Sequence, residues 1–184
     1  MEYLEQLARE WYEYQGYFVR TDLWVGFQPD GSYECELDVV AFHPLRRHIV
    51  HIEPSFDLLT TEEHEQHFRL KFEAGRKYLH RLFGVGPGHE LEQVALIESS
   101  DQRHLATIAG GRVILLPDFL TQILAALAPL DPASSLVPEH WPLVRTLHFV
   151  SRMGLPRESV NARISARAAA AHATYSNTSQ DPSS

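Results

Sequence analysis

Residues 33–55 read YECELDVVAFHPLRRHIVHIEPS, and this stretch decides the fold that the sequence predicts. Side chains from 33 to 42 alternate as in a strand with one apolar face and one acidic half-face. The segment HPLRR at 43–47 predicts a turn, and His48–Glu53 predicts a second strand that ends at Pro54, because proline has no N–H for a sheet ladder. The stretch therefore predicts an antiparallel hairpin. Its first strand places Cys35, Leu37, Val39 and Ala41 on one face and Glu34, Glu36, Asp38, Val40 and Phe42 on the other.

The position of the turn predicts which residues of this hairpin face each other. If the turn is centred near Leu45 and Arg46, residues whose numbers sum to about 91 are paired, and Asp38 faces Glu53. Directly opposed carboxylates destabilise a sheet, so such a pair requires a cation or a raised pKa. Magnesium or manganese meets this requirement, because both bind carboxylate oxygens and complete their shell with water and phosphate. The alternative is an exposed sheet edge at which both acids are solvated.

Helices and further strands are predicted on both sides of the hairpin. The helices are predicted at 2–14, 61–83, 117–127 and 140–153, and the strands at 17–27, 92–97 and 112–116. Strands and helices of this length favour an α/β fold, and the helix at 61–83 is expected to cover the sheet. The predicted fold class is therefore α/β, with a central mixed sheet of about five strands flanked by helices.

Length and composition indicate one domain. The chain has 184 residues, 44% of them hydrophobic, which is enough for one core without disulfides. We expect a single domain over 1–155 and a C-terminal extension over 156–184, partly helical and then disordered. Cys35 is the only cysteine, which favours a reducing compartment, and a cytoplasmic location is expected. No apolar run approaches the roughly 18 residues that span a bilayer, so no membrane association is expected.

The formal net charge of -8 bears on the partners of the protein. Phosphate contacts require lysine and arginine, so this charge counts against a domain that simply coats nucleic acid. It counts less against a nuclease, whose clustered acids are neutralised by divalent metal in the working state.

Four short motifs occur in an order that resembles a known superfamily. They are Glu5-x-x-Ala8, Gly16-Tyr17, Glu36-Leu37-Asp38-Val39-Val40-Ala41 and Ile49-Val50-His51-Ile52-Glu53. Together they are similar to the amino-terminal half of PD-(D/E)XK nucleases, over roughly residues 2–83 and more loosely to residue 116. The resemblance implies a restriction-endonuclease-like core of helix, three antiparallel strands, helix and a further strand.

The resemblance also implies a site and an activity. Asp38 and Glu53 would be metal ligands, and Glu5 an auxiliary acid from the first helix. Glu36 would be either a flanking ligand or a residue that supports the ligands without touching the metal. The implied cofactor is Mg or Mn, and the implied reaction is hydrolysis of phosphodiester bonds in nucleic acid, with DNA expected in preference to RNA. Recognition of a sequence would require the C-terminal segment, a homodimer or a partner protein.

One position departs from the superfamily pattern. The pattern ends in acid, any residue, lysine, whereas this chain reads Glu53-Pro54-Ser55. Serine cannot supply the fixed positive charge that stabilises the reacting phosphate. Lys71 lies on the apolar stripe of the second predicted helix, points towards the sheet, and is the candidate catalytic replacement. Its alternative role is an aliphatic stem over the core with the amine in water.

These residues leave two functions open. The first is a metal-dependent nuclease that uses Glu5, Asp38, Glu53 and Lys71. The second is a catalytically inactive protein of the same fold that acts as a structural or protein-interaction domain, which Ser55 and the acidic charge favour.

Three further residues are expected to be structural. Trp11 and Trp24 are expected to fill the core rather than to stack on bases, and His51 is expected to be packed on its strand.

Overall fold

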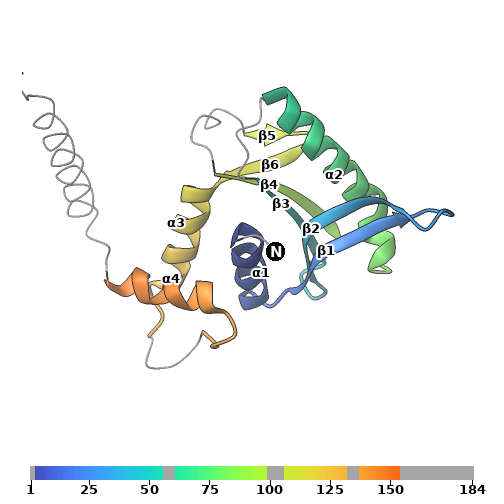
Figure 1. Ribbon diagram of the computed structural model, residues 1–184. Helices are drawn as coiled ribbons and strands as arrows, with labels where there is room; N and C mark the ends of the chain where they lie inside the picture. Colours follow the sequence, from blue (N-terminus) through green and yellow to red (C-terminus); the bar gives the residue numbers. More distant parts are fainter. Residues whose placement is uncertain (1–2, 56–60, 99–105, 132–136, 154–184) are drawn as a thin grey trace, which may run out of the picture.

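The computed structural model describes residues 3–55, 61–98, 106–131 and 137–153. They form an α/β fold in which a mixed six-stranded sheet is flanked by helices (Figure 1). The predicted fold class is confirmed at this level. The elements are α1 (Tyr3–Tyr14), β1 (Phe18–Phe27), β2 (Tyr33–His43), β3 (His48–Ser55), α2 (Thr61–Leu82), β4 (Glu90–Ile97), β5 (Thr107–Ile108), β6 (Gly111–Leu115), α3 (Leu116–Leu127) and α4 (Pro142–Met153).

The strand order in the sheet is β1-β2-β3-β4-β6-β5. The first three strands are antiparallel neighbours, whereas β4 pairs in parallel with both β3 and β6. The parallel step from β3 to β4 follows from α2, because a parallel neighbour requires a long crossover and a helix provides it. The sequence predicts about five strands, and the additional β5 has only two residues, too few for a periodic pattern.

Two helical layers cover the sheet (Figure 1). Helices α1, α3 and α4 pack on one face around a cluster that includes Leu4, Leu7 and Ile123, while α2 alone packs on the other face through Phe68 and Phe72. None of the described helices is long and apolar enough to cross a membrane. The proposed extension over 156–184 lies outside the described residues.

The β2–β3 hairpin has the predicted register, but it ends earlier than expected. The pairs run from His43↔His48 to Val39↔Ile52, so paired numbers sum to 91 as predicted, and the ladder stops before Asp38. The predicted alternation also changes at this point. Val39 and Ala41 pack on the α1 side, but Leu37 packs with Val40 and α2. The prediction that Cys35, Leu37, Val39 and Ala41 share one face is therefore wrong.

The change of face has a physical cause in β1. The β1–β2 register passes from Thr21↔Val39 to Leu23↔Leu37 without an Asp22↔Asp38 pair, and Asp22 has a left-handed backbone with φ of 53°. A residue in this conformation interrupts the pleat, so the side chains beyond it leave the regular alternation. A pattern of period two does not reveal such a break.

The prediction that the second hairpin strand ends at Pro54 is wrong, because β3 continues to Ser55. The Ser55 carbonyl accepts a hydrogen bond from the backbone N–H of Glu98, so the hydrogen-bonding groups of Ser55 point to the β4 side. These groups alternate along a strand, so the backbone of Pro54 points to the opposite side. On that opposite side β2 has already separated from β3, and the missing N–H of proline leaves no ladder partner unsatisfied.

The two tryptophans expected in the core have different environments. Trp11 is 8% exposed and belongs to the α1-side core, as predicted. Trp24 is 52% exposed, so that prediction is wrong. The reason is that the β1–β2 hairpin extends past the rest of the sheet (Figure 1), where the helices of the α1 side do not cover it.

Candidate functional site

Three side chains from three elements meet where β2 leaves β3. Lys71 of α2 places its Nζ 2.6 Å from Oδ1 of Asp38 on β2 and 3.2 Å from Oε2 of Glu53 on β3. Lys71 belongs to the same stripe of α2 as Phe68 and Phe72, which explains why its side chain crosses to the sheet instead of entering solvent. The prediction that Lys71 points towards the sheet is confirmed, and its amine forms ion pairs with the carboxylates of Asp38 and Glu53.

Glu53 is the most deeply buried acid of this group. Its side chain is fully buried, and its Oε1 accepts the backbone N–H of Asp38 at 3.1 Å and lies 2.6 Å from Nε2 of His51. Its Oε2 has no hydrogen-bond partner among the described residues, and Lys71 gives it only the ion pair at 3.2 Å. Lys71 is shared with Asp38, so two carboxylates depend on one positive charge, and this oxygen is suited to an additional cation.

The backbone geometry of β2 makes the Asp38 N–H available to Glu53. Asp38 lies beyond the last β2–β3 pair and at the missing β1–β2 pair, so the ladders are interrupted on both of its sides. A buried backbone N–H requires an acceptor, and the Glu53 carboxylate supplies it. The same break therefore places Asp38 and Glu53 side by side.

A series of hydrogen bonds that runs from Arg76 through Gln93 and His51 holds the Glu53 carboxylate in place. The amide Nε2 of Gln93 on β4 lies 3.1 Å from Nδ1 of His51 and donates to the carbonyl of Phe72 at 2.8 Å, while its Oε1 accepts from Arg76 at 2.6 Å. Because the Gln93 amide donates to Nδ1, the His51 proton resides on Nε2 and is donated to Glu53. His51 is buried on its strand as predicted, and it also orients a site carboxylate.

Gly75 of α2 makes room for this chain. A Cβ at this position would overlap Nδ1 of His51 and lie 2.9 Å from Nε2 of Gln93. Glycine therefore lets the helix backbone approach the two side chains closely, and any larger residue would displace them.

The electrostatics of the site follow from burial and from the shared lysine. Burial, and then hydrogen bonding and charge repulsion from Glu53, raise the pKa of Asp38 to about 7, although Lys71 acts in the opposite direction. Burial also raises the pKa of Glu53. For Lys71, burial acts to lower the pKa, but Glu53 and Asp38 together outweigh it and leave the pKa raised. Lys71 is therefore a permanent cation at neutral pH.

His51 is neutral at physiological pH. Burial, and then the positive charge of Lys71, lower the pKa of its imidazole to about 3. A neutral ring donates one hydrogen bond and accepts another, which agrees with its position between Glu53 and Gln93.

The other predicted site residues lie further from this meeting point. Glu5 is half-buried in the first turn of α1, and α1 packs on the sheet face opposite to α2. Glu36 lies opposite Trp24 on β1, and its carboxylate makes no hydrogen bond or ion pair with a described residue. The structure thus brings Asp38, Glu53 and Lys71 together and does not add Glu36 to them. Ser55, at the usual lysine position, is buried at the end of β3.

Gln93 and Arg76 were not predicted as site residues. Gln93 lies in EQVALI, where it reads as the polar start of a buried strand, and Arg76 reads as a surface cation outside the helical stripe. The parallel register His51↔Gln93 brings Gln93 beside His51. A single sequence carries no signal for the register of two strands separated by a helix, so this contact required the structure.

The donor set fits a hard divalent ion in part. Asp38 and Glu53 supply two carboxylates, one of them with an unsatisfied buried oxygen. Within the described part of the chain, no group of three or more His, Cys, Asp and Glu side chains has a metal-binding arrangement. Two protein carboxylates agree with magnesium or manganese, which retain waters and take substrate phosphate as ligands.

No protein-family model matches the chain, and no curated protein matches it either. The assignment of a function therefore depends on the residues and geometry of the site itself.

Proposed function

We propose that this protein is a metal-dependent nuclease of the PD-(D/E)XK type that hydrolyses phosphodiester bonds in nucleic acid, DNA in preference to RNA. The observation that carries the proposal is the convergence of Lys71 with Asp38 and Glu53, at 2.6 Å and 3.2 Å. Two acids and one lysine are the set that the superfamily pattern requires. The lysine comes from α2 and not from the position of Ser55.

Magnesium or manganese would be held by Asp38 and Glu53. When bound, the metal would supply a Lewis acid that polarises the phosphate and lowers the pKa of a bound water. The unsatisfied Oε2 of Glu53 and the raised pKa of Asp38 support this assignment, because both indicate that a single lysine leaves two carboxylates under-neutralised.

Lys71 would act as a fixed cation towards the phosphate. Its raised pKa keeps the amine protonated, so it cannot serve as a general base at neutral pH. Its half-buried stem is held by α2, which fixes the charge before substrate arrives. A positioned charge of this kind stabilises negative charge that develops in the transition state.

His51, Gln93 and Arg76 would position the ligand acid. The chain from Arg76 to Glu53 fixes the imidazole tautomer and the orientation of the carboxylate. Hydrogen-bonded partners behind a metal ligand typically affect metal affinity by about 10- to 100-fold. His51, Gln93 and Arg76 would act through Glu53 and would not touch the reacting phosphate.

The second candidate function is an inactive protein of the same fold that acts in a structural role or in contacts with other proteins. Two observations favour it: Ser55 stands where the superfamily pattern has lysine, and the Lys71 ion pairs partly neutralise the two acids without any metal. This function predicts that Lys71 contributes to stability and that divalent ions do not bind.

The test is cleavage of supercoiled plasmid and of labelled single-stranded DNA with magnesium or manganese. We expect cleavage by the wild type, loss of cleavage in Asp38→Asn and Lys71→Ala, and no change in Glu90→Gln, which alters an exposed carboxylate on β4. Absence of metal-dependent cleavage on both substrates would overturn the nuclease and favour the structural role.

We place the protein in the cytoplasm, as a further part of this proposal. Cys35 is the single cysteine and is free, which agrees with a reducing compartment. A homodimer or a partner protein would supply sequence recognition, because the site residues contact a phosphodiester rather than a base.

A further inference from the structure

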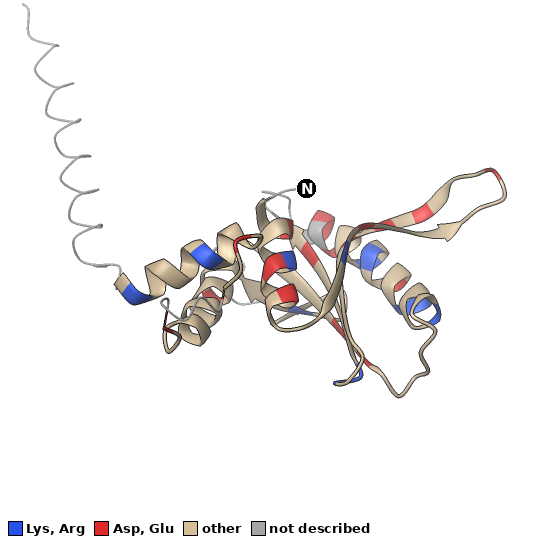
Figure 2. Cartoon of the chain, turned by 90° about the horizontal axis from the view of Figure 1, so that it is seen from below, with Lys and Arg blue, Asp and Glu red and all other residues tan. Residues whose placement is uncertain are grey.

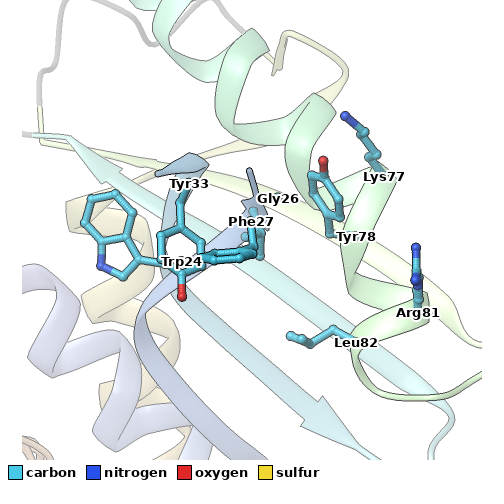
Figure 3. A pocket seen from close by; sticks show the side chains of 9 residues that line it. Trp24, Gly26, Phe27, Tyr33, Lys77, Tyr78, Arg81 and Leu82 are labelled. Carbon is cyan, nitrogen blue, oxygen red and sulfur yellow. The ribbon is translucent and has the colours of Figure 1, made fainter. Parts of the chain in front are cut away.

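A hollow of about 720 Å³ lies between the projecting hairpin and the C-terminal half of α2 (Figure 3). One wall is formed by the hairpin, with Trp24, Phe27 and Tyr33, and the other by α2, with Lys77 and Arg81. None of these residues belongs to the group of Asp38, Glu53 and Lys71. The hollow is therefore separate from the candidate site and adjoins it along the same two elements.

The hairpin wall is an exposed aromatic cluster. Trp24, Phe27 and Tyr33 are 52%, 69% and 47% exposed. The Tyr33 ring lies 6.0 Å from that of Trp24 and 5.4 Å from that of Phe27. Large aromatic side chains are rarely left exposed together without a partner, because their burial is strongly favourable. The faces of these rings offer a surface on which flat apolar groups can stack.

The α2 wall is basic, although the whole chain is acidic. Figure 2 shows Lys and Arg distributed along α2, beside the acidic residues of the hairpin. The Arg81 guanidinium is exposed and makes no hydrogen bond or ion pair with a described residue. Lys77 is 57% exposed and pairs with Glu34, a surface interaction that contributes little and exchanges readily for another anion.

The hairpin is anchored to α2, so the two walls keep their spacing. Glu34 of the hairpin accepts a hydrogen bond from the hydroxyl of Tyr78 on α2, a contact that does not depend on Lys77. Gly26 permits this approach, since it has a positive φ of 74° and an added Cβ would lie 2.8 Å from the Tyr78 hydroxyl. A rigid platform loses little entropy when a ligand binds to it.

The hollow also lies within reach of the candidate site. Trp24 is paired with Glu36, which is two residues from Asp38 and therefore about 7 Å from it along the strand. Lys77 follows Lys71 by six residues of helix, a rise of about 9 Å. The hollow thus lies within a few residues of Asp38 along β2 and of Lys71 along α2.

We propose that this hollow binds single-stranded nucleic acid, with unpaired bases stacked on Trp24, Phe27 and Tyr33 and the phosphate backbone facing Arg81 and Lys77. Aromatic rings and cations together are the combination that binds unpaired strands without sequence preference. In a duplex the base faces are covered by their neighbours, so exposed rings distinguish single strands from duplex. The inference deepens the proposed function, on which it rests for the claim that the bound strand is the substrate.

The experiment measures binding without cleavage. The full chain is titrated in EDTA with a short labelled oligothymidylate and with the corresponding duplex, and both anisotropy and tryptophan emission are recorded. We expect preference for the single strand, quenching of Trp24, and affinity reduced roughly tenfold in Trp24→Ala. Trp24→Phe should restore most of the affinity, because a ring remains for stacking. Phe149→Ala, an exposed aromatic on α4, should bind as the wild type does.

Three results would overturn the inference. The first is wild-type affinity in Trp24→Ala, and the second is equal binding of duplex through Trp24. The third is a homodimer in sedimentation velocity that Trp24→Ala dissociates, because the hollow would then hold a second copy. Binding in EDTA separates this inference from the proposed function. If the protein binds single strands through Trp24 but does not cleave with metal, only the nuclease proposal is refuted. If it cleaves with metal but Trp24 does not contribute to binding, only the proposed binding of single strands in the hollow is refuted.

Discussion

Two buried glutamates, Glu10 and Glu53, lie on different sides of the sheet and are satisfied to different degrees. Glu10 of α1 accepts a hydrogen bond from Gln6 on Oε1 and the backbone N–H groups of Leu143 and Val144 on Oε2. These N–H groups belong to the first turn of α4, where a carboxylate is favourable because no carbonyl within the helix reaches them. Glu53 has an oxygen with no hydrogen-bond partner among the described residues.

The difference between the two acids distinguishes a structural carboxylate from a functional one. Glu10 completes the hydrogen bonding of a helix end, and both of its oxygens accept hydrogen bonds from neighbouring groups. Glu53 is equally buried, but it shares one lysine with a second acid, and among the described residues its Oε2 has only the ion pair with that lysine. Unsatisfied buried polar groups reduce stability and are therefore expected mainly at sites that bind a ligand.

The largest effect is expected for Glu53→Gln. The proposed metal would lose a charged ligand, so cleavage should fall roughly 10²- to 10³-fold. Glutamine keeps the shape of the side chain and removes a poorly neutralised charge, so the free energy of unfolding without metal should not decrease. Initial cleavage rates and urea denaturation measure the two quantities. Equal cleavage by the variant would remove Glu53 from the site.

The reverse outcome is expected for Glu10→Ala. The change removes the acceptor of two buried backbone N–H groups at the start of α4, so the free energy of unfolding should fall by about 3 kcal/mol. Cleavage per folded molecule should stay unchanged. The control is Glu139→Ala, since this side chain is 90% exposed and pairs only at the surface with Arg145 among the described residues. A loss of activity at constant folded fraction would contradict a structural role for Glu10.

A smaller effect is expected from pH on the metal-free protein. The pKa of Asp38 is raised from 3.8 to about 7, so folding favours its protonated form. Its contribution to stability is complete below about pH 4 and is lost as the pH rises through 7. His51, whose pKa is lowered, acts in the opposite direction over the same pH range, so the contribution of Asp38 is measured as the difference between the wild type and Asp38→Asn. We expect this difference in unfolding free energy to fall by about 2 kcal/mol across the window, less than the full shift would give, because the group is partly solvated.

Asp38→Asn provides the control for this pH dependence. Asparagine does not ionise, so the decrease between pH 4 and 7 should be reduced in the variant. Magnesium should reduce the same decrease in the wild type, because a bound cation stabilises the ionised carboxylate in the folded state. A wild-type profile as flat as that of the variant would show that burial does not raise the pKa of Asp38.

The smallest effect is expected for Gln93→Leu. Without the Gln93 amide, Nδ1 of His51 loses its donor, and the imidazole no longer holds a fixed tautomer against Glu53. Metal affinity should fall by about tenfold, with a smaller change in cleavage at saturating metal. Calorimetry measures the affinity, and Arg112→Ala on neighbouring β6 is the control, since Arg112 is exposed and among the described residues pairs only with half-buried Glu92. Unchanged affinity would limit Gln93 to a packing role.

The sequence predicted the parts of the site that depend on local patterns. The turn at residues 43–47 was sufficient to give the β2–β3 register, and the helical stripe was sufficient to direct Lys71 at the sheet. Both predictions rest on the fixed periods of strands and helices. The α/β class, with a mixed sheet flanked by helices, was also predicted, because strand and helix patterns are local features of the sequence.

The parts that the sequence did not predict depend on breaks in those periods and on distant contacts. The left-handed Asp22 ends the regular alternation near Asp38, and Pro54 is accommodated only because β2 has already left β3. Gln93 reaches His51 through a parallel register across a helix crossover. Trp24 was assigned to the core from its residue type, because the length by which a hairpin projects is not encoded in its pattern.

The central claim is that Asp38 and Glu53 bind a divalent metal, and calorimetric titration of manganese into the wild type and Asp38→Ala tests it most directly. We predict saturable binding by the wild type with release of protons near pH 6.5, because Asp38, with a pKa of about 7, must ionise to bind the ion. Asp38→Ala should show neither binding nor proton release. Absence of binding by the wild type at millimolar manganese would contradict the claim and assign Lys71 to a structural ion pair.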